Sequence, residues 1–201
     1  MEETIEVSRK AVDAGADAIV VVTPFYIKMS QTSIYNFYSR IADAISSKII
    51  AYNIPQFTGN ELSAETLSRL MGEHSNIIGV KDSSGDLRTT QNYISMLPHG
   101  SYVYQGQDDL LLPSISLGVS GGVCGTTNFT DLAVRIWKSS GSDARQLQLM
   151  IYRLMRKLSL VEFPKAYYYL FEKLVLKNDT PRNYMPQPIE DLSPEEERAI
   201  E

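Results

Sequence analysis

Five short apolar runs alternate along this chain with longer segments whose apolar residues recur every three or four positions. The short runs are rich in β-branched residues and too short for helices, so each predicts a buried strand, while the longer segments predict helices. The predicted strands are Ala18 to Thr23, Ile49 to Tyr52, Ile77 to Lys81, Tyr102 to Gly106 and Gly121 to Cys124. Strands that alternate with helices across short loops imply an α/β fold with a parallel sheet.

Two of these strands end in a reactive side chain. One apolar run leads directly into Lys81 and the preceding one leads into Tyr52, just before a proline that cannot continue a sheet ladder. Burial of Lys81 disfavours its ammonium form and leaves free amine that can attack a ketone and form a Schiff base. The alternative is a lysine that extends from the strand end into water. If the sheet closes into a barrel, both strand ends open onto one mouth, where barrel enzymes hold their catalytic residues.

Four motifs, in this order and at these separations, resemble the dihydrodipicolinate synthase and N-acetylneuraminate lyase superfamily of Schiff-base lyases. They are Thr23-Pro24-Phe25-Tyr26, Tyr52-Asn53-Ile54-Pro55, Gly79-Val80-Lys81-Asp82 and Gly106-Gln107-Asp108. Within the superfamily the chain is most similar to archaeal-type 2-keto-3-deoxygluconate aldolases. That similarity rests on Gln56-Phe57-Thr58, Gln105 to Asp109, Gly121 to Asn128, and the tail from Pro181-Arg182 to Arg198.

The resemblance implies a partial TIM (β/α)8 barrel, in which the five strands are strands four to eight of the family barrel. We expect the first three strands, with their Gly-Thr-Thr-Gly-Glu-like loop, to be missing, because nothing like that loop occurs and Met1 leads into an apolar-periodic helix from Glu3 to Ala14. We expect residues 1–138 to form the partial barrel. A polar break at 139–143 separates it from a helical segment, residues 139–201, that packs beside the barrel.

The resemblance also assigns roles to individual residues. Lys81 is the expected Schiff-base nucleophile, Tyr52 the proton relay, and Tyr26 a tyrosine that reaches across an interface into a neighbouring active site. The expected substrate-binding residues are Asp108, Gly106, Gly125, Thr126, Lys28 and Arg182. For Asp108 and its neighbour Asp109 the alternative role is capping of a helix N-terminus, which also favours acids.

Departures from the relatives bear on the substrate. Dihydrodipicolinate synthases have an arginine at the position of Phe57, and an apolar ring cannot grip a carboxylate bidentately. Aldolases for the phosphorylated sugar acid use two arginines and a tyrosine at positions that match Lys28, Ile54 and Arg182, so two of the three are changed. We therefore expect cleavage of unphosphorylated 2-keto-3-deoxygluconate to pyruvate and glyceraldehyde. The alternatives are dihydrodipicolinate synthase, an aldolase for the phosphorylated acid, and an inactive truncated remnant.

Composition narrows the class of protein. The 43% hydrophobic and 21% charged residues are typical of a globular domain, and the net charge of -5 without a basic cluster argues against nucleic-acid binding. No run reaches membrane-spanning length, and the only cysteine, Cys124, favours a cytoplasmic setting. His74 and His99 lack metal-ligand spacing. We expect a small 2-keto acid as the partner, no cofactor or metal, and a homo-oligomer, either a dimer or a tetramer.

Overall fold

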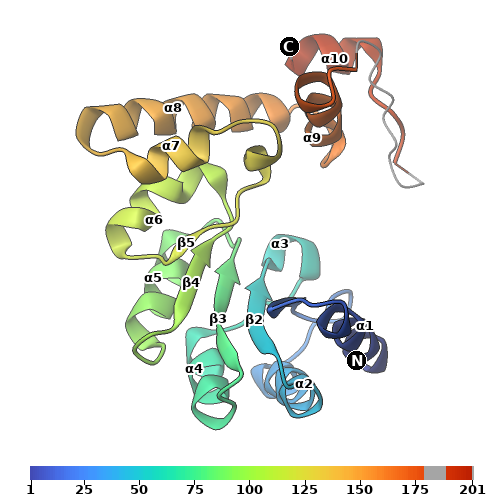
Figure 1. Cartoon of the computed structure of the whole chain (residues 1–201), viewed down its shortest axis with the longest axis vertical. Coiled ribbons are helices and arrows are strands. Elements are labelled where there is room, and N and C mark those ends of the chain that lie inside the picture. Colours follow the sequence, from blue (N-terminus) through green and yellow to red (C-terminus); the bar gives the residue numbers. More distant parts are fainter. Residues whose placement is uncertain (179–188, 201) are drawn as a thin grey trace. The chain divides into compact units, whose positions relative to one another are not determined.

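The computed structural model describes residues 1–178 and 189–200. Five parallel strands form one sheet in the order β1-β2-β3-β4-β5, and helices connect them (Figure 1). The α/β class and the parallel sheet are therefore confirmed. The strands are β1 (Ala18–Val22), β2 (Lys48–Asn53), β3 (Ile77–Asp82), β4 (Tyr102–Gln105) and β5 (Gly121–Gly122).

All five strands begin at or within one residue of the predicted position. The last strand is shorter than expected, because Cys124 already precedes the 3-10 helix η2 (Gly125–Asn128). The other helical elements are α1 (Glu2–Asp13), α2 (Gln31–Ala44), α3 (Pro55–Thr58), α4 (Ala64–Glu73), α5 (Leu87–Met96), η1 (Asp108–Leu110), α6 (Leu111–Leu117), α7 (Leu132–Lys138), α8 (Gly141–Leu158), α9 (Lys165–Leu170), η3 (Phe171–Val175) and α10 (Pro194–Ile200). None of the described helices is long and apolar enough to cross a membrane.

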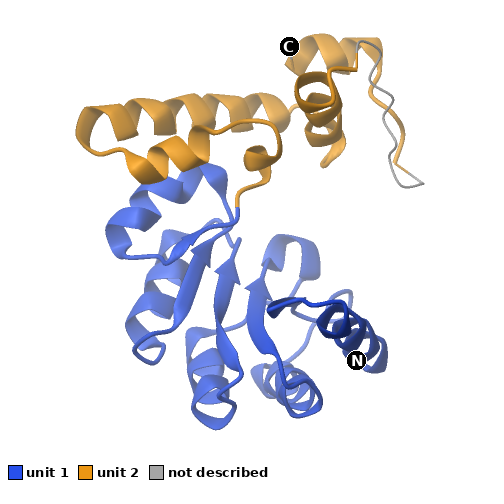
Figure 2. Ribbon diagram, in the orientation of Figure 1, with its two compact units in different colours: residues 1–123 blue, residues 124–201 orange. Residues whose placement is uncertain are grey.

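The chain divides into two compact units, Met1–Val123 and Cys124–Glu201 (Figure 2). The first unit holds the sheet and the second is helical. We predicted a boundary after Lys138, which is the position between α7 and α8. The two units instead divide between Val123 and Cys124, so the predicted boundary lies inside the second unit. These two helices pack against each other, so α7 groups with the helical segment rather than with the sheet.

One face of the sheet carries the core of the first unit. Alternate residues of β1 and β2, among them Ile19, Val21, Ile49 and Ala51, are buried against helices, with fully buried contributions from α2 and α4. Residues that point to the other face are less covered, and Val20 is more than half exposed. Because side chains alternate along a strand, this less covered face is also the face of Tyr52 and Lys81.

Helix ends in the first unit follow from their capping residues. Ser63, the N-cap of α4, accepts a hydrogen bond from the Thr66 amide at 3.1 Å. Ser30 caps α2 in the same way, and Asp86 caps α5. Such caps satisfy amides that have no partner inside the helix. They fix where each helix starts, and thereby the length of the loop that leads into the following element.

The second unit has its own small core, which includes Leu158, Ala166, Tyr169 and Ile200. The last helix, α10, begins with a reciprocal capping box. The Glu196 amide donates to Ser193 Oγ at 3.2 Å, and the Ser193 amide donates to Glu196 Oε2 at 2.8 Å. The serine at the N-cap and the acids in the first turn are the residue types that favour a helix start.

Candidate active site

Lys81 and Tyr52 lie next to each other at the C-terminal ends of β3 and β2. They are direct partners in the parallel register, and Lys81 Nζ is 4.1 Å from the centroid of the Tyr52 ring. Both side chains are half-buried. A cation above the face of an aromatic ring is attracted by the ring's quadrupole, so this contact holds the amine at the mouth of the sheet. The sequence-predicted nucleophile and proton relay are therefore brought together.

Ser83 continues this site beyond the end of β3. Its hydroxyl donates to Tyr52 Oη across 3.4 Å, which links the phenol to the segment that follows Lys81. Its carbonyl oxygen accepts hydrogen bonds from two side-chain amides, Gln56 Nε2 at 2.7 Å and Gln107 Nε2 at 2.9 Å. Three strand-end loops are thus joined at one backbone atom. These hydrogen bonds hold the loop that follows Lys81 in place beside the amine and the phenol.

Gly106 leaves room for the lysine at the end of β4. A Cβ built there would overlap Ser83 Oγ and would lie 3.1 Å from Lys81 Cε. The Gly106 amide donates to the Asp82 carbonyl at 2.7 Å, so the backbone is held close to β3. Glycine is the residue that permits this approach without displacing either side chain.

Asp108 and Asp109 follow Gly106 in the 3-10 helix η1. Asp108 is only 2% exposed and lies with Asp109 in the first turn of η1, a position that favours acids. Asp109 is half-buried, and burial raises the pKa of its carboxyl group. Both acids follow closely after Gly106, which comes directly after the last residue of β4.

Tyr26 occupies a loop that Asn60 holds in place. Its side chain is 96% exposed and its backbone adopts a φ of 75°, a conformation that is strained for a residue with a Cβ. Buried Asn60 donates from Nδ2 to the carbonyls of Pro24 and Ile27 at 2.8 Å each, and it accepts from the Met29 amide at 2.7 Å. The loop is therefore fixed while its tyrosine faces solvent.

The remaining predicted binding residues belong to other segments of the chain. Lys28 is exposed in the loop of Tyr26. Gly125 and Thr126 belong to η2 in the second unit, where a Cβ at Gly125 would come within 2.8 Å of the Tyr167 ring. Arg182 lies outside the described residues. The structure gives no geometry that joins these positions to Lys81.

Sequence reasoning missed several residues around Lys81. Ser83 and Tyr104 border it, Tyr104 as its direct partner on β4 in the parallel register. Strand alternation supplied the signal for both, since Ser83 lies two residues after Lys81 and Tyr104 two residues before Gly106. Gln56 and Gln107 lie in the quoted motifs, but no sequence pattern indicated that their side chains would bind the Ser83 carbonyl. These contacts depend on the geometry of the loops.

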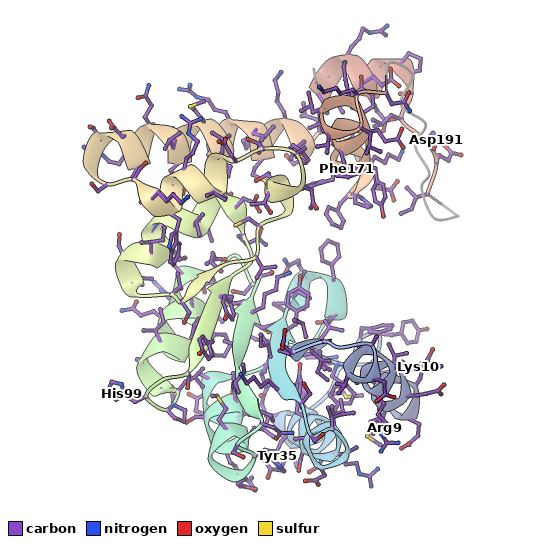
Figure 3. All side chains as sticks on the ribbon, viewed as in Figure 1. Arg9, Lys10, Tyr35, His99, Phe171 and Asp191 are labelled. Carbon is purple, nitrogen blue, oxygen red and sulfur yellow. The ribbon has the colours of Figure 1, made fainter. Side chains whose placement is uncertain are left out.

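Histidines and metal ligands do not add to this site. His99 lies in the turn between α5 and β4, at the opposite end of β4 from its arrowhead (Figure 3). His74 ends α4 and contacts Ser39 Oγ through Nε2 at 2.9 Å. Within residues 1–178 and 189–200, no group of three or more His, Cys, Asp or Glu side chains is placed to hold a metal ion.

Comparison with known proteins identifies the family. The chain is 41% identical over 191 residues to a 2-dehydro-3-deoxy-D-gluconate/2-dehydro-3-deoxy-phosphogluconate aldolase of Picrophilus torridus, which covers 92% of this chain and 70% of the relative. The solved 2-keto 3-deoxygluconate aldolase from Picrophilus torridus superposes with a TM-score of 0.88 at 40% identity, over 96% of this chain and 70% of that one. A dihydrodipicolinate synthase from Acinetobacter baumannii complexed with pyruvate gives a TM-score of 0.86 at 30% identity, over 99% and 68%.

The chain thus spans about two thirds of the length of these relatives. The match to the family itself extends over residues 1–201. It includes the strand ends that carry Tyr52 and Lys81 and the glycine beside them. The chain therefore belongs to the dihydrodipicolinate synthetase family.

Proposed function

We propose that this protein is a Schiff-base aldolase, a carbon-carbon lyase that cleaves 2-keto-3-deoxygluconate to pyruvate and glyceraldehyde. The observation that carries the proposal is the position of Lys81 Nζ, 4.1 Å from the Tyr52 ring at adjacent strand ends. A primary amine beside a phenol supplies a nucleophile and a proton-transfer group in one place. The names of the Picrophilus torridus relatives support the substrate class.

The reaction begins with attack by the Lys81 amine on the C2 ketone of the substrate. The carbinolamine that forms loses water to give an iminium ion, which withdraws electrons from the C3–C4 bond. Tyr52 relays the proton of the C4 hydroxyl as that bond breaks and glyceraldehyde leaves, accepting it while its own phenol proton passes to the substrate carboxylate. The bonding electrons form an enamine, which is protonated at C3. Water then releases pyruvate and restores the free amine.

Tyr26 has a proposed place in this scheme. Its exposed ring and strained backbone suit a residue that completes the site of a neighbouring copy in a homo-oligomer. Asn60 holds the loop in that conformation from within the chain. We propose that Tyr26 takes part in catalysis across such an interface, in a dimer or a tetramer.

The proposed substrate is the unphosphorylated acid. Phe57 in α3 is exposed and supplies no charge for the carboxylate of aspartate semialdehyde. Lys28 is the one described cation among the three positions that match the phosphate site. The proposed contacts to the sugar acid are Asp108, Gly106, Gly125, Thr126, Lys28 and Arg182.

A barrel provides the setting for this chemistry. We propose that β1 to β5 are strands four to eight of an eight-stranded barrel, with Lys81 at its C-terminal mouth. The parallel order of the strands supports this placement. So does the half-exposed face that carries Val20 and Tyr102, because the corresponding face of a closed barrel is filled by side chains from the facing strands.

Dihydrodipicolinate synthase is the second candidate, favoured by the match to the Acinetobacter baumannii enzyme. Its reaction uses the same lysine and pyruvate, so the two functions differ in the aldehyde. Incubation of the full-length protein with 2-keto-3-deoxygluconate, with pyruvate release as the signal, tests the proposal. Pyruvate release without added metal or nucleotide is the expected result. Absence of cleavage together with condensation of pyruvate and aspartate semialdehyde would favour the second candidate.

A further inference from the structure

A row of buried polar side chains lies directly behind the catalytic strand ends. Asn53, Asp82 and Gln105 are partners in the parallel register of β2, β3 and β4, each one residue after the position that faces the site. Alternation places them on the opposite face of the sheet from Tyr52 and Lys81. All three are 0–1% exposed. Three adjacent buried polar residues at this depth require an explanation, because burial of polar groups is costly unless they are hydrogen-bonded.

Asp82 is the centre of this row. Its Oδ1 accepts from Asn53 Nδ2 at 3.1 Å and from the Ser84 amide at 3.0 Å, and its Oδ2 accepts from Thr90 Oγ1 at 2.7 Å. These three donors are uncharged and come from β2, from the loop after β3 and from α5. Hydrogen bonds to a carboxylate are shorter and stronger than those between neutral groups. The carboxylate thus fixes the end of β3 from three directions.

Gln105 extends the row toward the catalytic face. Its Nε2 donates to Ser114 Oγ on α6 at 2.7 Å, and its Oε1 accepts from the Gln107 amide at 2.8 Å. The Gln107 side chain in turn holds the carbonyl of Ser83, beside Tyr52. A continuous set of hydrogen bonds therefore joins the buried row to the loop that borders the amine.

We propose that Asn53, Asp82 and Gln105, anchored by Thr90, form a positioning unit that sets the backbone on which Tyr52 and Lys81 are placed. The inference rests on the proposed Schiff-base function. The row lies on the helix side of the sheet, so it acts through the adjacent backbone and touches no substrate. A displacement of about 1 Å in a reacting group can cost roughly a hundredfold in rate. A unit that holds neighbouring strand ends in register therefore affects turnover more than substrate binding.

Thr90 offers a matched pair of variants. Thr90→Val replaces the hydroxyl that donates to Asp82 with a methyl group of similar size, whereas Thr90→Ser keeps the hydroxyl and removes the methyl group. Thr89→Val, at the adjacent and less buried position of the same helix, is the control. Each full-length protein is assayed for kcat and KM, for the rate of borohydride-trapped pyruvate adduct on Lys81, and for its melting temperature.

We expect Thr90→Val to lower kcat and the adduct rate about tenfold while KM stays within about twofold, the pattern of a misplaced reacting group. Thr90→Ser and Thr89→Val should stay within about twofold of wild type in kcat, KM and adduct rate. Ser114→Ala removes the acceptor of Gln105 and is a milder second perturbation if Thr90→Val does not fold, with a severalfold fall in kcat expected at unchanged KM.

Three outcomes distinguish failure of the inference from failure of the function. Wild-type protein that forms the Lys81 adduct, with a Thr90→Val or Ser114→Ala variant that melts earlier but keeps wild-type kcat, would show that the row is only structural and would overturn the inference alone. Equal losses in Thr90→Ser and Thr90→Val would also overturn it, because the hydroxyl would then be irrelevant. Wild-type protein that forms no adduct on Lys81 would overturn the proposed function and the inference together.

Discussion

Lys81 lies directly opposite Tyr52 in the register of β3 and β2, with its Nζ 4.1 Å from the centroid of the tyrosine ring. The contact places the amine over the ring face, while the phenol oxygen is within 3.4 Å of Ser83 Oγ. The ring of Tyr52 therefore contacts the amine, while its hydroxyl contacts Ser83. Loss of either side chain of this pair should therefore impair catalysis in its own way.

Replacement of Lys81 by arginine should abolish Schiff-base formation. Arginine keeps the positive charge but cannot supply a free amine, so pyruvate and borohydride should give no adduct in Lys81→Arg. Lys48→Arg, at the exposed beginning of β2, is the matched control and should trap pyruvate as wild type does. Mass spectrometry of the peptides locates the adduct. Trapping that survives in Lys81→Arg would disprove the assignment.

Loss of the Tyr52 hydroxyl should separate iminium formation from cleavage. Tyr52→Phe keeps the ring that contacts Lys81, so pyruvate trapping should be largely retained, while turnover falls by roughly a hundredfold or more. Tyr102→Phe, on the same face at the beginning of β4, should leave turnover unchanged. Turnover of Tyr52→Phe within a few-fold of wild type would mean that the proton takes another route.

The regular part of the fold could be predicted because its physical signal is local. Strands such as Ile77–Asp82 are short β-branched runs, and Ser63 and Ser193 mark helix starts through their own hydrogen bonds. Within the helical segment that we predicted at 139–201, α9 is followed directly by the π-helical η3. Apolar spacing over so few turns does not distinguish one hydrogen-bond spacing from the other.

The site could be predicted only where a reactive side chain ends an apolar run in the sequence. Lys81 and Tyr52 terminate apolar runs, so their positions followed from the pattern, but their direct pairing depends on strand order and register. The buried row behind them was missed, because Asp82 in sequence looks like a polar residue that leaves a strand. Its burial arises from donors that are distant in sequence, above all Asn53 and Thr90.

Addition of one methyl group at Gly106 should disturb the amine. In Gly106→Ala the new Cβ would overlap Ser83 Oγ and crowd Lys81 Cε, so we expect kcat to fall about tenfold or more, as for an overpacked site whose reacting group shifts. Gly72→Ala in α4, where a Cβ meets nothing within 4 Å, is the control and should keep full activity. Steady-state kinetics measures both. Wild-type kcat in Gly106→Ala would show that the space beside Lys81 is not needed.

The stability of α10 should depend on acid pH through Glu196. The Ser193 amide that donates to this carboxylate holds the pKa of Glu196 below its ordinary value of 4.5, with a smaller contribution from Lys165. The folded state therefore binds the proton more weakly than the unfolded state. The carboxylate's stabilisation is fully present above pH 4.5 and is lost as the pH falls through the lower folded pKa.

Glu196→Gln keeps the capping geometry and removes only the charge, so its effect isolates this contribution. Hydrogen exchange of the α10 amides should be faster in the variant than in wild type at pH 7, and the two should converge as the pH falls below the lowered pKa of Glu196, where both side chains are neutral. Glu195→Gln, an exposed acid in the same turn, should differ little from wild type at either pH. A difference that persists undiminished at low pH would exclude the charge as its cause.

The last prediction concerns the choice of substrate, which follows from Phe57 and from the Lys28 and Ile54 replacements. The protein should cleave 2-keto-3-deoxygluconate in preference to its phosphorylated form. A charge-assisted contact between an arginine and a phosphate contributes about 1.5 to 3 kcal/mol. Loss of one such donor lowers kcat/KM for the phosphorylated acid by roughly ten- to a hundredfold relative to an aldolase that retains it.

Comparison of kcat/KM for the two sugar acids, and for pyruvate with aspartate semialdehyde, checks this order. Phe57→Arg supplies the missing carboxylate fork at an exposed position of α3, so it should raise condensation with the semialdehyde while cleavage of the sugar acid changes less. Phe57→Leu keeps the position apolar and should leave the order of substrates unchanged. A clear wild-type preference for the phosphorylated acid would assign the protein to the aldolases for that acid, and efficient condensation with the semialdehyde would assign it to the dihydrodipicolinate synthases. The lysine chemistry is common to these three activities, so only the groups around the aldehyde decide between them.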